Sequence, residues 1–404
     1  MLVYTTNMRE KRVICVVTGT RAEYGLLRRL MQMLEKSENA ELRIVVTGSH
    51  LEPYFGNTYK IIVEDGFTIT RKVPLALLSD SPLNVATALS NAVRGLAEAF
   101  ESIRPDLLVV LGDRYEILGA AQAAMILQIP IAHIHGGERT EGAIDEAIRH
   151  SLTKMSHLHF ASCSEYRTRI IQLGENPKYV WDTGSIALDN FENLRNISKS
   201  EILLSLNLQE QQHLILCTMH PETLLKMRAN EFISPLLEAL SGIPNANIIF
   251  TLGNADAEGK EINEAIQKFS RMNPSTTRVE PSLGQTRYLN ALKAANLMVG
   301  NSSSGIVEAS SAGTMVVNIG NRQKGRIRSE NVLDVANSKS EIQKAIELGL
   351  TMEKQEMAKM VVSPFGKPGA SKKIYDVITQ IDIEGILQKS FHDIHLAKSR
   401  LGSN

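Results

Sequence analysis

The sequence has few cysteines, few aromatic residues and no excess of either charge. Three cysteines stand far apart among 404 residues, which fits a reducing compartment better than a disulfide framework. Lys plus Arg and Asp plus Glu both total 44, so no global field favours nucleic acid or an anionic membrane. Aromatic residues make up 5% of the chain and no basic stripe accompanies them, which leaves a single-stranded nucleic-acid platform with little support.

Long apolar runs are also missing. Runs such as Leu107–Leu111 are far too short to cross a bilayer, and Met1–Lys11 contains no long apolar stretch before a cleavage site. We therefore expect a soluble, cytoplasmic protein with no membrane or nucleic-acid partner. Hydrophobic residues nevertheless make up 43% of the chain, ample for more than one buried core, which excludes disorder, fibres and small stapled scaffolds.

From Val13 onward, short apolar runs of strand length alternate with longer helical patterns. Strands that are apolar almost throughout are typical of a parallel sheet covered on both faces, and strands that alternate with helices indicate βαβ units. Ser81 before Pro82 is a helix start. The expected strands are Val13–Thr18, Leu42–Thr47, Asp106–Leu111, Ile129–His135 and His157–Ala161, and the expected helices are Glu23–Leu34, Pro82–Ile103, Tyr115–Leu127 and Ile144–Met155.

A polar segment near Asn190–Ser200 interrupts this alternation, and Ser198 with Glu201 forms a capping-box start for a new helix. We expect an N-terminal domain over 1–195, a C-terminal domain over 196–368, and a C-terminal helix in 369–404 that crosses back to the first domain. The fold class is thus α/β, with two Rossmann-like domains that face each other across a cleft. The second half is expected to contain strands His213–Thr218, Asn247–Thr251, Leu297–Val299 and Met315–Ile319, and helices Asn230–Leu240, Glu258–Ser270, Leu283–Ala294, Ile306–Ser311 and Ser371–Leu387.

Charged and glycine-rich segments follow the expected strands of the first half, at the edge where an open α/β sheet binds ligands. Gly19–Gly25, with Arg21 and Tyr24, is a turn into a helix that suits a diphosphate, but it is neither a dinucleotide-binding fingerprint nor a P-loop. Asp113 and Arg114 follow the next such strand, where Asp113 could move a proton and Arg114 could bind an anion. A capped helix with a surface arginine and a salt-bridged loop are the structural alternatives.

Two histidines close the expected strand Ile129–His135. His133 and His135 are two residues apart and would face the same side of a strand, which raises a metal site with Asp113 and Asp145 as further ligands. No metal-binding motif accompanies them, so we favour a metal-free acid/base cluster of His135, Glu138, Asp113 and Asp145, with no cofactor. His133, earlier in the strand, is the better candidate for a structural role.

Polar residues also follow the expected strands of the second half. His220 and Asn254 come after the first two of them. Ser302, Ser303 and Ser304 form a turn into a helix that would direct amides and hydroxyls at one phosphate, with Glu308 one turn later as an acceptor for ribose hydroxyls. Arg322 follows the last strand and could reach the same phosphates; a serine-rich helix cap is the structural alternative. The Ser/Gly turn is not a nucleophile elbow, so an esterase triad is unsupported.

Taken together, these segments resemble the UDP-N-acetylglucosamine 2-epimerase family, and particularly its hydrolysing branch used in sialic-acid-type sugar biosynthesis. They stand in order from residue 19 to residue 323, and the set is far more specific than any one member. The segments are Gly19–Tyr24, Gly112–Arg114, His133–Glu138, Ile144–His150, Asn301–Gly305 and Asn318–Gln323.

The resemblance implies a GT-B-like fold, a sugar-nucleotide substrate held mainly by the second domain, and a homo-oligomer, either a dimer or a tetramer. It implies catalytic roles for Asp113, His135, Glu138, Asp145 and His220, the first four of which surround the reacting sugar. Non-hydrolysing relatives usually carry Glu where this chain has His135, which leaves the base that removes the C2 proton open. The sugar-nucleotide contacts that it implies are Arg21, Tyr24, Arg114, His220, Asn254, Ser302, Ser303, Ser304, Glu308 and Arg322.

The implied reaction removes the C2 proton while the diphosphate leaves C1, giving a 1,2-ene sugar. Water adds to this glycal and a proton returns to the opposite face of C2, which yields a free N-acetylmannosamine-type sugar and a nucleoside diphosphate. Three alternatives stay open: a non-hydrolysing epimerase, an inverting glycosyltransferase and a sugar-nucleotide sensor. The residues do not decide between UDP and GDP, or between N-acetylglucosamine and a 6-deoxy, 4-acetamido sugar.

Overall fold

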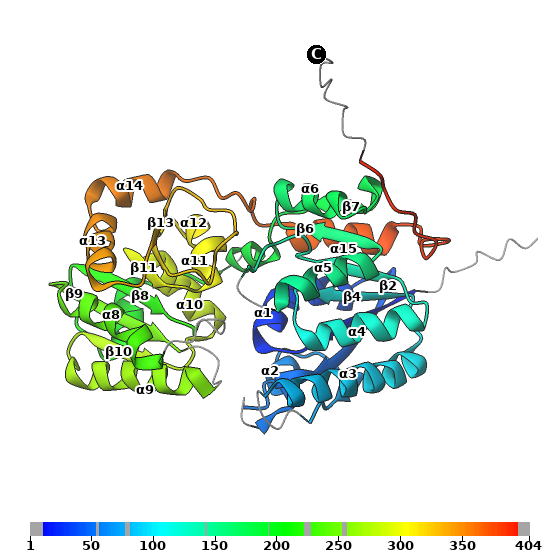
Figure 1. Cartoon of the computed structure of the whole chain (residues 1–404), viewed down its shortest axis with the longest axis horizontal. Coiled ribbons are helices and arrows are strands. Elements are labelled where there is room, and N and C mark those ends of the chain that lie inside the picture. Colours follow the sequence, from blue (N-terminus) through cyan, green and yellow to red (C-terminus); the bar gives the residue numbers. More distant parts are fainter. Residues whose placement is uncertain are drawn as a thin grey trace, which may run out of the picture.

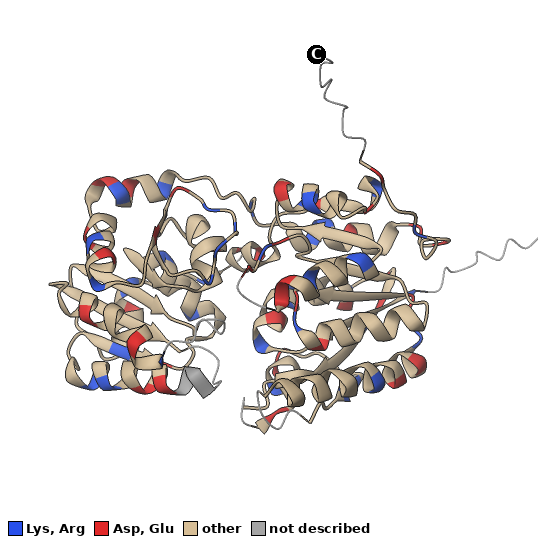
Figure 2. Cartoon of the chain, viewed as in Figure 1, with Lys and Arg blue, Asp and Glu red and all other residues tan. Residues whose placement is uncertain are grey.

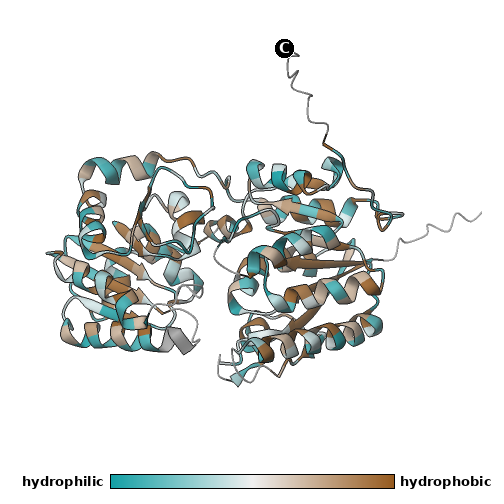
Figure 3. Ribbon diagram, in the orientation of Figure 1, coloured by the Kyte–Doolittle hydropathy of each residue, from teal (hydrophilic) through white to brown (hydrophobic). Residues whose placement is uncertain are grey.

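The computed structural model describes residues 11–53, 56–76, 81–141, 144–192, 194–221, 228–252 and 257–394. Two α/β lobes lie side by side, and each has a sheet with helices packed on it (Figure 1). The strands are the most hydrophobic segments (Figure 3), whereas charged residues concentrate on helices and loops (Figure 2). This division confirms the predicted α/β class with two Rossmann-like domains.

The N-terminal domain contains a seven-stranded, fully parallel sheet in the order β3-β2-β1-β4-β5-β6-β7. Every residue of β4, β5 and β6 is buried, as the apolar runs predict for strands covered on both faces. The strands are β1 (Arg12–Thr18), β2 (Ala40–Thr47), β3 (Arg71–Val73), β4 (Leu107–Leu111), β5 (Ile131–Ile134), β6 (Leu158–Ala161) and β7 (Val180–Asp182).

Side-chain caps begin two of the α-helices of this domain, and the cap at Ser81 was predicted. The Thr20 hydroxyl accepts the Glu23 amide at the start of α1, and Ser81 accepts the Asn84 amide before Pro82 at the start of α3. The helices are α1 (Arg21–Glu35), α2 (Tyr59–Glu64), α3 (Pro82–Ile103), α4 (Tyr115–Ile126), α5 (Asp145–Met155) and α6 (Ser164–Gln172), with 3₁₀ turns η1 (Gly48–Leu51), η3 (Pro177–Tyr179) and η4 (Ile186–Phe191).

The C-terminal domain repeats the plan with a six-stranded parallel sheet in the order β10-β9-β8-β11-β12-β13. It opens with the predicted capping box, in which Ser198 and Glu201 satisfy each other's amides. Its strands are β8 (His213–Thr218), β9 (Ala246–Thr251), β10 (Thr277–Glu280), β11 (Leu297–Gly300), β12 (Met315–Ile319) and β13 (Val332–Val335). Its helices are α7 (Lys199–Ser205), α8 (Ala229–Ser241), α9 (Ala257–Met272), α10 (Gly284–Ala294), α11 (Ser303–Val307), α12 (Ala309–Ala312), α13 (Lys339–Gly349) and α14 (Met352–Met360).

The strand order reverses once in each sheet, between β1 and β4 and between β8 and β11. Loops that follow such a pair of strands leave the sheet in opposite directions, which opens a crevice at the carboxyl ends. Gly19–Thr20 and Gly112–Asp113 therefore meet at one crevice, while Met219–His220 and Asn301–Ser302 meet at the other.

Helix α15 (Ala370–Gln380) returns to the N-terminal domain, as predicted, and packs against α1 (Figure 1). Its start is capped by Asp189, whose buried carboxylate accepts the amides of Gly369, Ala370 and Ser371. The predicted extension of this helix to Leu387 is wrong. The Arg12 guanidinium donates to the carbonyls of Ile378 and Ile381 at 2.7 and 2.8 Å, so an arginine from β1 satisfies the end of the helix.

Two further predicted elements differ in detail. The helix expected over Ile306–Ser311 begins at Ser303, and it is divided into α11 and α12 at Glu308. The strand expected to reach His135 ends at Ile134, because His135 adopts a left-handed φ of 66°. Within the described residues, no helix has both the length and the apolar composition to cross a membrane.

Candidate active site

A cavity of about 760 Å³ lies between the two domains, at the carboxyl ends of their strands. Thr218 and Thr251, the last residues of β8 and β9, line it, and α1 forms the facing wall. Its volume is typical of a site for a ligand larger than a single sugar or base. Six of the residues predicted to bind the sugar nucleotide line this cavity: Arg21, Tyr24, Ser302, Ser303, Ser304 and Glu308.

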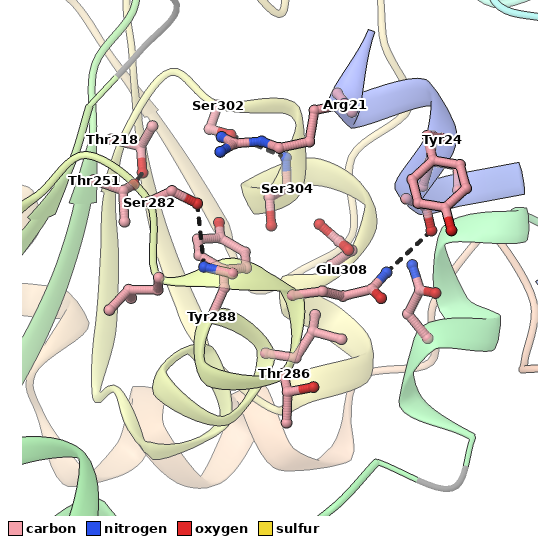
Figure 4. Close-up of a pocket in the computed structure, with 18 of the residues that line it drawn as sticks. Arg21, Tyr24, Thr218, Thr251, Ser282, Thr286, Tyr288, Ser302, Ser304 and Glu308 are labelled. Carbon is pink, nitrogen blue, oxygen red and sulfur yellow. Dashed lines mark hydrogen bonds between the residues drawn. The ribbon is translucent and has the colours of Figure 1, made fainter. Parts of the chain in front are cut away.

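Arg21 and the serine turn face each other across this cavity. Figure 4 shows the Arg21 side chain reaching from α1 toward Ser302 and Ser304. The Ser302 hydroxyl accepts the Ser304 amide, which fixes the turn. A cation on one wall and hydroxyls with free amides on the other give the anion-binding chemistry that a diphosphate requires.

Glu308 lines the same cavity as Tyr288, close enough for its charge to act on that side chain (Figure 4). Burial raises the pKa of Glu308 to about 7, although a hydrogen bond from Ser304 opposes the shift. The side chain is therefore close to half ionised near neutral pH and becomes a better hydrogen-bond acceptor as the pH rises.

His220 and Arg322 are brought to the serine turn by Asn301. The Asn301 side chain accepts the His220 amide at 2.7 Å and donates to the His220 carbonyl at 2.8 Å, while its own carbonyl accepts Arg322 Nη1 at 3.0 Å. Burial, and then the Arg322 charge, lower the pKa of His220 to about 3, so this imidazole is neutral at physiological pH. Asn301 stands in one of the motifs that carry the family resemblance, but no role was predicted for it.

The predicted acid/base residues form a buried cluster around Arg149. The Arg149 guanidinium pairs with Asp113, donates to the His135 carbonyl at 2.7 Å and lies 3.8 Å from Glu138 Oε2. Glu138 also accepts the Ser162 hydroxyl at 2.8 Å and lies 3.3 Å from His135 Nδ1. Arg149 had been missed as a site residue. It stands four residues after Asp145, so a helical reading of this segment already places both on one face.

The pKa values of two carboxyl groups in this cluster are shifted in opposite directions. Burial alone would raise the pKa of Glu138, but His135, Arg149, Arg326 and the Ser162 hydrogen bond outweigh it and lower the pKa to about 2. For Asp145, burial and then the Asp113 charge raise the pKa. Glu138 is thus held ionised, whereas Asp145 retains its proton more readily, and such perturbed pKa values are typical of groups that transfer protons.

The two histidines have different surroundings. His133 is fully buried and its Nε2 donates to the Gly112 carbonyl at 2.8 Å, which agrees with a structural role. His135 Nε2 accepts the Ile186 amide at 3.4 Å and its Nδ1 faces Glu138; burial lowers its pKa, more strongly than Glu138 raises it. Because the left-handed turn at His135 ends the strand, the expected alternation does not extend to it. Among the described residues, no group of three His, Cys, Asp or Glu side chains has the arrangement of a metal site.

Two acidic side chains near Arg114, those of Glu116 and Glu23, had no predicted role. Arg114 Nε lies 2.6 Å from the fully buried Glu116, and the neighbouring Glu23 accepts the Gly19 amide at 2.7 Å. Burial and then the Glu116 charge raise the pKa of Glu23 to about 8. The ion pair with Glu116 fixes the Arg114 side chain, and Glu23 fixes the turn between β1 and α1 through Gly19.

The structure thus separates the predicted residues into two neighbouring groups. Within the described part of the chain, Asp113, Arg114, His135, Glu138, Asp145, His220 and Arg322 are not part of the cavity wall, whereas the six residues above are. Asn254 lies outside the described residues. The two groups adjoin through the β1–α1 turn on one side and through Asn301 on the other.

Two parallel-sheet α/β domains with a cavity at their seam define the GT-B-like class of fold. The solved structure of UDP-GlcNAc 2-epimerase from Neisseria meningitidis, bound to UDP-GlcNAc, has this fold. It superposes with a TM-score of 0.78 at 19% identity, over 92% of this chain and all of that one.

Sequence similarity identifies the family within this fold class. A model of the family described as UDP-N-acetylglucosamine 2-epimerase matches residues 32–379. The "GDP/UDP-N,N'-diacetylbacillosamine 2-epimerase (hydrolyzing)" of Campylobacter jejuni is 40% identical over 95% of this chain and 100% of its own length. The "Polysialic acid biosynthesis protein P7" of Escherichia coli is 36% identical over 94% of this chain and 97% of its own. The chain belongs to the UDP-N-acetylglucosamine 2-epimerase family, and the assignment to its hydrolysing branch is confirmed.

Proposed function

We propose that this protein converts a UDP- or GDP-linked 2-acetamido sugar into the free, C2-inverted sugar and the nucleoside diphosphate. The observation that carries this proposal is the juxtaposition at one seam of a cavity large enough for a sugar nucleotide and a largely buried acid/base cluster. The name of the Campylobacter relative supports an N,N'-diacetylbacillosamine substrate, and that of the Escherichia coli relative supports polysialic acid biosynthesis.

Arg21, Arg114 and Arg322 would stabilise the negative charge that develops on the departing diphosphate. Such charge is stabilised most by donors that are already in place before the reaction. Arg114 and Arg322 are fixed in this way by Glu116 and by the Asn301 carbonyl. Glu308 would accept hydrogen bonds from the ribose hydroxyls.

The acid/base cluster would handle the proton on C2. Asp145, whose pKa is raised, is suited to deliver a proton, and the Arg149-bound Asp113 would be the carboxylate that accepts one. Glu138, whose pKa is lowered, would stay ionised beside His135 and support proton transfer through it. In this sequence the C2–H bond and the C1–O bond break, and the resulting 1,2-ene sugar takes up water at C1. A proton added to the opposite face of C2 completes the inversion.

A panel of four substrates tests the proposal: UDP- and GDP-linked N-acetylglucosamine and N,N'-diacetylbacillosamine, each incubated with the purified protein in heavy water. We expect equal amounts of nucleoside diphosphate and free sugar, with deuterium at the inverted C2. Protium retained at that carbon would contradict exchange through a solvent-accessible acid.

The other products identify the competing functions. A nucleotide-linked product would indicate a non-hydrolysing epimerase, and turnover only with an added acceptor would indicate a glycosyltransferase. Saturable binding without a product would indicate a sensor. The homo-oligomer and the cytoplasmic location stay predictions, which size-exclusion chromatography with light scattering and cell fractionation would test.

A further inference from the structure

The loop after β12 connects the serine turn of the C-terminal domain with the acid cluster of the N-terminal domain. At its start, Arg322 and Gln323 both donate to the Asn301 carbonyl, at 3.0 and 2.8 Å. At its end, the Ile327 amide donates to the Tyr166 hydroxyl of α6 at 3.2 Å. The loop is therefore bound to both domains within six residues.

Arg326 lies between these two attachments and faces Glu138. Its Nη2 is 3.8 Å from Glu138 Oε2, and the side chains of Arg326 and Glu138 are 14% and 6% exposed. This ion pair joins residues that are 188 positions apart in sequence and belong to different domains. In so protected a place the interaction is screened far less than a surface pair.

The other groups around Glu138 come from its own domain. His135 Nδ1, the Ser162 hydroxyl and Arg149 Nη1 lie 3.3, 2.8 and 3.8 Å from its carboxylate oxygens. Arg149 also pairs with Asp113, so its charge is shared between two carboxylates. A buried carboxylate that loses a cationic partner is left undercompensated, which favours its protonated form.

We propose that Arg326 is a positioning residue that holds the Glu138 carboxylate in place and ionised. Because Arg326 is supplied by the second domain, the acid cluster is complete only when the loop after β12 is seated on the serine turn. The inference depends on the proposed function, since that reaction is what would use Glu138.

The test compares Arg326→Gln and Arg326→Lys with Arg328→Gln. Arg328 is a matched control in the same loop. It pairs with Asp334 of its own domain at 3.0 Å, and its Nη1 donates to the Arg326 carbonyl at 2.6 Å, so its loss perturbs the loop without removing a partner of Glu138. Initial rates of diphosphate release are measured against pH, and affinity for UDP and GDP is measured by calorimetry.

For Arg326→Gln we expect kcat to fall by about 10- to 100-fold, because a displaced acid/base group is costly. KM and nucleotide affinity should change by no more than about threefold, because the cavity wall is intact. The acid limb of the kcat profile should move to higher pH, since loss of a positive charge raises the pKa of Glu138. Arg326→Lys keeps the charge and should keep the limb in place, and Arg328→Gln should resemble the wild type.

The proposal is overturned if Arg326→Gln and Arg328→Gln behave alike. It is equally overturned if Arg326→Gln loses nucleotide affinity and kcat together with no movement of the acid limb, which would make the loop merely structural. If the wild type turns over no sugar nucleotide, the proposed function fails and Arg326 is judged without turnover. In that case a carbon-13 NMR titration, with the Glu138 signal assigned by Glu138→Gln, must show a higher pKa in Arg326→Gln; an unchanged titration refutes the inference.

Discussion

Replacement of Arg149 by methionine is the sharpest test of how the acid cluster is held together. The Arg149 side chain is 3% exposed, pairs with Asp113, lies 3.8 Å from Glu138 and donates to the His135 carbonyl at 2.7 Å. Methionine fills much of the same space but carries no charge and no donor. The substitution therefore leaves two carboxylates close together with a buried carbonyl unpaired.

Removal of one partner from a buried ion pair costs about 3–5 kcal/mol, because the remaining charge is desolvated without compensation. We expect Arg149→Met to lower the free energy of unfolding of the N-terminal domain by about that amount, against a typical total of about 5–15 kcal/mol. The kcat should fall by at least about 100-fold, since two of the proton-transfer candidates lose their orientation. Arg149→Lys keeps the charge but lacks the forked geometry, so its stability and its kcat should lie between those of the wild type and those of Arg149→Met.

Trp181, the single tryptophan, provides the assay. It lies on β7 and stacks on Phe160 with ring centroids 5.4 Å apart, so its fluorescence reports unfolding of the N-terminal domain in a urea titration. Arg94→Met is the matched control. It breaks an exposed i,i+4 pair with Glu98 on α3 and should change stability by no more than about 0.5 kcal/mol. A loss for Arg149→Met no larger than for Arg94→Met, with kcat retained, would refute the reasoning.

Three further substitutions test other parts of the molecule. Asp113→Asn should lower turnover by about 10² to 10⁴ if this carboxylate moves a proton, and a folded, nucleotide-binding variant with undiminished turnover would contradict that role. Nucleotide affinity should rise as the pH increases through about 7, where Glu308 ionises, and calorimetry of Glu308→Gln should show weaker binding without this dependence. Asp189→Ala removes three amide hydrogen bonds from the start of α15 and should lower the free energy of unfolding in urea by about 2–4 kcal/mol. The control Ser338→Ala, which removes the cap of α13, should lower it by about 1 kcal/mol. Equal losses would show that Asp189 does not anchor the returning helix.

Some of this structure follows from short windows of sequence. The apolar run Leu107–Leu111 predicts a buried parallel strand, Ser81 and Pro82 predict the start of α3, and Ser198 with Glu201 predicts the start of α7. Each signal is local, because hydrophobic periodicity and capping act over one or two turns of chain. The serine turn was found in the same way, since strand, turn and helix start are adjacent in sequence.

Local signals failed where a distant partner decided the outcome. The helix after Gly369 ends at Gln380 because Arg12, more than 360 residues earlier, takes up its terminal carbonyls. His135 was expected to share a strand face with His133, but its left-handed backbone ends the strand before it. Its ring faces Ser185 and Glu138.

The amino-acid sequence by itself thus determined the order of strands and helices, the caps, and the chemical groups present at the carboxyl ends of the strands. Only the tertiary structure decided which of those groups form ion pairs: Arg149 with Asp113 and Glu138, and Arg326 with Glu138 across the domain seam. The reason is physical. Periodicity and capping depend on neighbours along the chain, whereas the compensation of a buried charge depends on whatever folding brings within a few ångströms of it.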